Sequence, residues 1–141
     1  MNIRLFKLKD SEKLSQLYSE QWPTTINSEC IDKFLSNDNY LFVAELKGEI
    51  IGAATLHLQH KLVHNCSTMG FIENVIVSKK HRHLGVGQKI VCELINQAKD
   101  KKCYKLVLSC KEYLENFYKK CDMKKSKQIG MIKTFEENFT Y

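Results

Sequence analysis

The chain has 141 residues, of which 43% are hydrophobic and 27% are charged, a composition typical of one globular domain. Its six cysteines form no C-x-x-C pair, and no run approaches the ~20 apolar residues needed to cross a bilayer. This argues against a disulfide framework and a membrane protein. The opening residues carry charges between their apolar side chains, so we expect no secretory leader and a cytoplasmic location.

The net charge of +6 is unevenly distributed, because residues 1–78 carry −2 and residues 79–141 carry +8. A positive field attracts phosphorylated ligands and speeds their encounter with the protein. No nucleic-acid-binding module or interleaved aromatic platform accompanies the lysines. We therefore expect the basic half to bind a phosphate-rich cofactor and expect no nucleic acid partner.

Hydrophobic periodicity and turn residues predict a series of strands and helices. In order, they are a strand (3–8), a helix (11–20) capped by Asp10 and Ser11, a helix (28–36), two strands (40–46 and 49–58) joined by a tight turn at Lys47 and Gly48, a polar loop (59–68), a strand (69–77), a helix ending near residue 100, a strand (104–110), a helix (112–121) and a last strand (129–135). An antiparallel first half followed by a crossover second half indicates a mixed sheet of the α+β class in a single domain, 1–141.

The most informative stretch is the buried strand that ends at Val77, followed by Arg82, Gly85 and Gly87 and then by an amphipathic helix. Helix N-termini offer unpaired N–H groups and a partial positive charge, which suit anions. Glycine leaves that backbone open to a diphosphate. The spacing therefore predicts a phosphate site at the start of this helix, whose apolar face comprises Ile90, Val91, Leu94, Ile95 and Ala98.

Two familiar phosphate motifs do not fit this loop. The dinucleotide fingerprint requires a third glycine where Ile90 stands, and Gly87-Gln88-Lys89 lacks the end of a P-loop. The spacing Arg-x-x-Gly-x-Gly after a hydrophobic strand instead resembles the acetyl-CoA diphosphate loop of the GNAT N-acetyltransferase superfamily.

A second segment strengthens the resemblance. The strand that opens with Cys103-Tyr104-Lys105 precedes the aromatic pair Phe117 and Tyr118, as in GNAT enzymes, and Ile72-Glu73-Asn74 is similar to the Ile-Glu-Asp strand of glucosamine-6-phosphate N-acetyltransferases. The resemblance covers roughly residues 69–135. It implies the GNAT fold, a mixed and mostly antiparallel central sheet flanked by helices, in which the parallel strands 69–77 and 104–110 splay apart.

The same resemblance implies roles for particular residues. Tyr118 would donate a proton to the coenzyme A sulfur, and Glu73 would contact the acceptor or draw its ammonium proton through water. Asn74 and Ser109 would contact the acceptor. Acetyl-CoA would be held largely by main-chain N–H groups, at Val75, Ile76 and Val77 for the thioester and pantetheine and at Arg82, His83, Leu84, Gly85, Val86, Gly87 and Gln88 for the diphosphate.

The implied activity is acetyl transfer from acetyl-CoA to the primary amine of a small molecule by direct attack in a ternary complex, with glucosamine 6-phosphate as the leading acceptor. Asn74 and Ser109 stand where those enzymes carry aspartate. Another small amine, such as an amino acid or a polyamine, a peptide amine and a non-catalytic acyl-CoA-binding domain therefore stay open. The family often forms dimers through its C-terminal strand, and residues 129–135 could serve in a homodimer.

A histidine-rich stretch offers the alternative of a metal site. Zinc accepts such ligands, but the spacings of His57, His60, His64 and Cys66 match no structural motif, and they supply no activated thiolate for a Cys–His nucleophile. We expect surface histidines and no metal.

Overall fold

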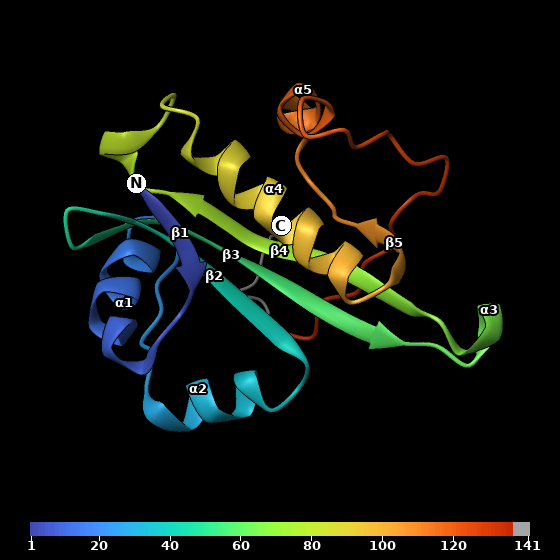
Figure 1. Cartoon of the computed structure of the whole chain (residues 1–141), viewed down its shortest axis with the longest axis horizontal. Coiled ribbons are helices and arrows are strands. Elements are labelled where there is room, and N and C mark those ends of the chain that lie inside the picture. Colours follow the sequence, from blue (N-terminus) through green and yellow to red (C-terminus); the bar gives the residue numbers. More distant parts are fainter. Residues whose placement is uncertain (137–141) are drawn as a thin grey trace. The chain divides into compact units, whose positions relative to one another are not determined.

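The computed structural model describes residues 1–136, and the chain divides into two compact units, Met1–Leu108 and Ser109–Tyr141. The first unit contains β1 (Asn2–Leu5), η1 (Leu8–Asp10), α1 (Ser11–Ser19), α2 (Ser28–Leu35), β2 (Asn39–Leu46), β3 (Glu49–His60), α3 (Val63–Cys66), β4 (Thr68–Val77), η2 (Lys79–His81), α4 (Val86–Asp100) and β5 (Cys103–Val107) (Figure 1). The second unit contains η3 (Glu112–Leu114) and α5 (Glu115–Lys119). Among residues 1–136, no helix is long and apolar enough to cross a membrane.

The strands form one five-stranded sheet in the order β1-β2-β3-β4-β5. Strands β1 to β4 pair antiparallel, whereas β4 and β5 pair parallel. The turn between β2 and β3 has positive φ at Lys47 (50°) and Gly48 (82°), as a tight hairpin requires. The predicted hairpin and mixed, mostly antiparallel sheet are therefore confirmed.

Consecutive residues of β3 show how helices cover both faces of this sheet. A Cβ atom on Gly52 would lie 2.7 Å from Cδ1 of Ile90, so α4 packs directly on the strand there. The next residue, Ala53, belongs to a buried cluster with Leu14 and Leu17 of α1. Since neighbouring strand residues point to opposite faces, α4 and α1 cover opposite sides of the sheet. Figure 1 shows α4 passing across β3 and β4, with α1 and α2 beside β1 and β2.

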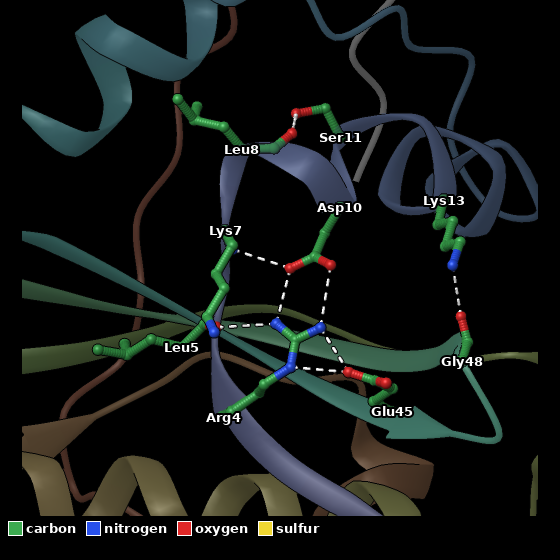
Figure 2. Close-up of polar contacts among 9 residues, drawn as sticks. All are labelled: Arg4, Leu5, Lys7, Leu8, Asp10, Ser11, Lys13, Glu45 and Gly48. Carbon is green, nitrogen blue, oxygen red and sulfur yellow. Dashed lines mark hydrogen bonds and ion pairs between the residues drawn. The ribbon is translucent and has the colours of Figure 1, made fainter.

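A charged network joins the first strand to the first helical turn (Figure 2). Arg4 donates to both carboxylate oxygens of Asp10, at 2.7 and 2.9 Å, and its Nε donates to Glu45 at 2.8 Å. The backbone N–H of Lys7 also donates to Asp10, at 2.8 Å. The prediction that Asp10 caps α1 with its side chain is wrong, because Arg4 and Lys7 take up that carboxylate.

Strands β4 and β5 pair along only part of their length. The parallel register runs from Thr68 opposite Cys103 to Phe71 opposite Val107, where β5 ends. Within the described residues, no strand pairs with β4 on this side beyond Phe71. The predicted splay is confirmed, although β5 ends before the predicted residue 110.

The C-terminal prediction is wrong within the described part of the chain. Residues 129–135 adopt no strand, and Ile129, Met131 and Phe135 are 85%, 88% and 88% exposed. An alternating apolar pattern makes a strand only when a neighbouring backbone accepts its hydrogen bonds, and residues 1–136 provide none here. The predicted helix 112–121 is divided into η3 and α5, and the predicted loop 59–68 contains the end of β3 and the α3 turn.

Candidate functional site

The half of β4 that does not pair with β5 contains a β-bulge, where β4 lies against β3. Ala53 of β3 lies opposite Ile76, and Thr55 lies opposite Glu73, so that the two residues Asn74 and Val75 oppose Ala54 alone. Asn74 occupies this bulge with φ at 52°, in the left-handed region that asparagine tolerates better than most residues. The bulge breaks the regular ladder beside the free edge of β4, where a ligand can pair with the main chain.

The predicted cofactor residues of this strand differ in exposure. Ile76 is buried in the core facing α1, while Val75 and Val77 are half-buried. Any contact from Ile76 to a ligand therefore has to come from its main chain. That these positions hold a cofactor through backbone groups stays a prediction.

A short loop connects β4 to α4. The exposed Arg82 donates from Nε to the carbonyl oxygen of Val77 at 3.3 Å, which ties the loop to the end of the strand. His83 and Gly85 have positive φ, at 66° and 76°. These two left-handed residues turn the chain from the loop into α4. The loop folds back on β4 before the helix begins, so the strand edge and the helix start lie at one end of the sheet.

Helix α4 begins at Val86 with Gly85 as its N-cap residue. Gly85 has no side chain, and a Cβ atom built there would meet no atom within 4 Å, so the space above it is open. Val86 and Gly87 are buried against the sheet, while Leu84 is 65% exposed beside the helix start. The positive end of a 15-residue helix is therefore accessible at a point where its N–H groups can meet an anion.

A glutamate that directly follows α1 supports this loop. The Oε2 atom of Glu20 accepts a hydrogen bond from the main-chain N–H of Lys79 at 2.8 Å. Lys79 opens η2, the single turn that precedes Arg82. The contact fixes the start of the loop against the face of the sheet that α1 covers.

The other predicted residues near β4 lie at its free edge. Glu73 is exposed and opposite Thr55, and paired residues of antiparallel strands share a face of the sheet. Asn74 is exposed and lines a cavity on that face. The structure thus brings the predicted acceptor contacts Glu73 and Asn74 together on β4.

Two predicted residues belong to the second unit. Tyr118 lies in α5, where its ring meets that of Phe117 edge to face at 4.9 Å between centroids. Burial raises the pKa of Tyr118 to about 12, so its phenol keeps its proton at neutral pH. Ser109 is exposed and follows the end of β5, which corrects its predicted place within that strand, since sheet pairing stops at Val107.

Sequence reasoning missed a cavity of about 180 Å³ between the sheet and the first two helices. Its lining is mostly apolar and comprises Phe6, Leu14, Tyr18, Ile26, Cys30, Ile31, Phe34, Leu41, Thr55 and Asn74. Tyr18 and Thr55 form a hydrogen bond within it, and burial raises the pKa of Tyr18 to about 12. The only available signal was a threonine within the apolar run of β3, which does not by itself indicate a cavity.

The histidines of the β3–β4 region have nearby partners. Nε2 of His60 lies 2.7 Å from Oδ2 of Asp38, and its Nδ1 lies 3.0 Å from Oγ1 of Thr68. The ring of His57 contacts Asn39, and the ring of His64 packs on Tyr104 at 4.9 Å between centroids. That these histidines bind no metal stays a prediction.

Comparison with known proteins identifies the family of this chain. The acetyltransferase (GNAT) family profile matches residues 11–123, most of the chain and part of both units. The chain belongs to the GNAT family. This GNAT protein is similar to glucosamine 6-phosphate N-acetyltransferase 1 of Oryza sativa subsp. japonica, with 31% identity over 100 residues, which make up 69% of this chain and 61% of that protein.

Two further relatives support the assignment. A probable glucosamine 6-phosphate N-acetyltransferase of Drosophila melanogaster is 40% identical over 85 residues, 59% of this chain and 39% of that protein. The chain thus spans less than two thirds of the length of these two curated relatives. The crystal structure of glucosamine-6-phosphate N-acetyltransferase from Arabidopsis thaliana has a TM-score of 0.87 with this GNAT protein at 29% identity, over 96% of this chain and 98% of that one.

Proposed function

We propose that this GNAT protein transfers the acetyl group of acetyl-CoA to the primary amine of a small molecule, with glucosamine 6-phosphate as the leading acceptor. The observation that carries the proposal is the free, bulged edge of β4, which leads through a short loop into the open N-terminus of α4. Relatives named as glucosamine 6-phosphate N-acetyltransferases support the choice of acceptor.

Acetyl-CoA would bind along these backbone groups. The main-chain groups of Val75, Ile76 and Val77 would hold the thioester and pantetheine, as an added strand pairs with a sheet edge. The N–H groups from His83 to Gln88 would hold the diphosphate, and the exposed guanidinium of Arg82 would add charge.

The reaction requires an uncharged amine, so the acceptor ammonium first loses a proton, which we assign to Glu73 acting directly or through water. The amine nitrogen then attacks the thioester carbon, forming the C–N bond. The C–S bond breaks, and the departing thiolate takes a proton from the phenol of Tyr118. The amide nitrogen then passes its extra proton through water to the phenolate of Tyr118, which restores the phenol. Glu73 releases to solvent the proton that it took from the ammonium, so one proton is released per turnover.

The acceptor would contact Glu73, Asn74 and Ser109. Glu73 contributes a negative charge that suits an ammonium, whereas Asn74 and Ser109 offer neutral hydrogen-bonding groups to sugar hydroxyls. The structure describes the β4 residues and Ser109 in separate units, so the role of Ser109 stays a prediction.

Release of coenzyme A thiol tests the proposal. The full chain is incubated with acetyl-CoA, a thiol-detecting dye and a panel of glucosamine 6-phosphate, glucosamine, amino acids, spermidine and a peptide amine. We expect thiol release with glucosamine 6-phosphate and a product heavier by one acetyl group. Release with another amine alone would reassign the acceptor, and release with none would indicate a non-catalytic acyl-CoA-binding domain.

We further propose that residues 1–141 act as one catalytic domain in the cytoplasm, where thiols remain reduced. Within residues 1–136, no two cysteines form a disulfide. The exposed apolar side chains of residues 129–135 form the surface we propose for a homodimer. Light scattering of the full chain, compared with a variant carrying serine at Ile129, Met131 and Phe135, tests that assembly.

A further inference from the structure

We propose that the cavity lined by residues of α1, α2 and the sheet is an acyl subsite, which admits the aliphatic tail of acyl thioesters longer than acetyl. The inference rests on the proposed function, because it assigns the cavity to the acyl donor of that reaction. It extends the donors from acetyl-CoA to short-chain acyl-CoA.

The position of the cavity connects it to the reacting group. Among its ten lining residues, the one from β4 is Asn74, the bulge residue, which lies between Glu73 and Val75. Thr55 lines the same cavity and faces Glu73 across the strands. An acyl carbonyl held at the main chain beside this bulge therefore has the cavity next to it on the α1 face of the sheet.

The lining suits a hydrocarbon chain. None of its ten residues carries a formal charge at neutral pH, and most are aliphatic or aromatic. The polar pair of half-buried Tyr18 and buried Thr55 is joined by its own hydrogen bond, so an apolar occupant leaves neither hydroxyl newly unsatisfied there. A sugar phosphate, by contrast, would lose hydration without gaining a charged partner.

The size and the opening also fit a short chain. A volume of about 180 Å³ equals the share of roughly six water molecules in the liquid, which is room for the carbons of a butyryl group beyond the carbonyl. Cys30 and Asn74 are exposed, whereas Leu14, Ile31, Leu41 and Thr55 are buried. The cavity is therefore open at Cys30 and Asn74 and closed at its base.

The chemistry of transfer is unchanged by the longer chain. The amine nitrogen bonds to the acyl carbon, the C–S bond breaks, the thiolate takes up one proton and the amine releases two. No further reactant is needed. Each methylene buried in the cavity strengthens binding about fourfold, so the two extra methylenes of butyryl-CoA should make it bind about fifteenfold more tightly than acetyl-CoA.

The experiment measures dissociation constants of acetyl-CoA and butyryl-CoA by calorimetry and transfer to glucosamine 6-phosphate by mass spectrometry. The test variant is Cys30→Phe, which narrows the opening. Cys92→Phe makes the same change at an exposed position in α4 outside the cavity. Ile26→Ala, which enlarges the cavity, is measured with hexanoyl-CoA in case the first variant does not fold.

We expect the preference for butyryl-CoA over acetyl-CoA to fall about fivefold or more in Cys30→Phe and to stay at the wild-type value in Cys92→Phe. Ile26→Ala should improve hexanoyl-CoA binding. The subsite would be overturned if the wild type, Cys30→Phe and Cys92→Phe all showed the same preference for butyryl-CoA over acetyl-CoA. It would also be overturned if the wild-type protein bound acetyl-CoA but rejected butyryl-CoA. Acetylation of hexylamine that is blocked by Cys30→Phe would instead assign the cavity to the acceptor.

These outcomes separate the inference from the proposed function. Acetyl transfer without binding of butyryl-CoA rejects the acyl subsite alone. Tight butyryl-CoA binding that depends on Cys30, without transfer to any amine, supports the subsite and rejects the enzymatic proposal.

Discussion

Replacing Gly85 by alanine tests whether a diphosphate approaches the start of α4. Gly85 has φ at 76°, a conformation that costs an L-residue with a side chain about 1–2 kcal/mol. A Cβ atom at this position meets no protein atom within 4 Å, so this backbone strain is the whole expected loss of folding free energy. The new methyl group projects into the open space where the ligand would lie.

Gly48→Ala is a matched control for that strain. Gly48 has φ at 82°, a Cβ atom there would also meet nothing within 4 Å, and it lies in the β2–β3 turn. Both variants should therefore lose about 1–2 kcal/mol in the free energy of unfolding, measured by urea denaturation. Only Gly85→Ala should also weaken acetyl-CoA binding.

The loss of affinity follows from the hydrogen bonds at risk. One charge-assisted hydrogen bond between a main-chain N–H and a phosphate is worth about 1.5–3 kcal/mol, so pushing the diphosphate away should raise the dissociation constant about tenfold to a hundredfold. Calorimetric titration with acetyl-CoA measures this value in both variants. If Gly85→Ala binds acetyl-CoA as tightly as Gly48→Ala does, the diphosphate lies elsewhere.

Three other predictions follow from single contacts. Tyr118→Phe should lower turnover about a hundredfold while the acetyl-CoA dissociation constant stays the same, because burial raises the pKa of this phenol to about 12 and keeps its proton available; unchanged turnover would remove its role as the acid. Asp10→Asn should lower the free energy of unfolding at pH 7 by about 2 kcal/mol, measured by urea denaturation. The hydrogen bond from Arg4 lowers the pKa of Asp10, so this contribution is complete above the unfolded pKa of about 4 and disappears as the pH falls through the folded value; a difference that persists in strong acid would contradict it. Glu20→Ala removes the acceptor for the N–H of Lys79 and should weaken acetyl-CoA binding about threefold to tenfold, whereas Glu20→Gln keeps an acceptor and should restore most of it in the same titration; equal loss in both variants would show that the contact does not position the loop.

The local sequence was sufficient for the elements whose signals lie within a few residues. The tight turn at Lys47 and Gly48, the glycine at the start of α4 and the apolar face of that helix were predicted and are present. Each is set by backbone conformation or by helical spacing, which neighbouring residues determine. The same reasoning failed at Asp10, where a residue six positions away competes for the carboxylate.

Only the tertiary structure decided the features that depend on distant partners. Pairing of β4 with β5 stops at Phe71, the extra residue at Asn74 shifts the register against β3, and the cavity forms where α1 and α2 leave the sheet incompletely covered. Residues 129–135 alternate as a strand does, yet they find no pairing partner within residues 1–136. The sequence by itself determined which segments could become strands and helices and where a phosphate could meet a helix. Which strand edge stays free and which side chains surround a cavity were decided by the fold, because register and packing depend on backbone hydrogen bonds and contacts between segments far apart in the chain.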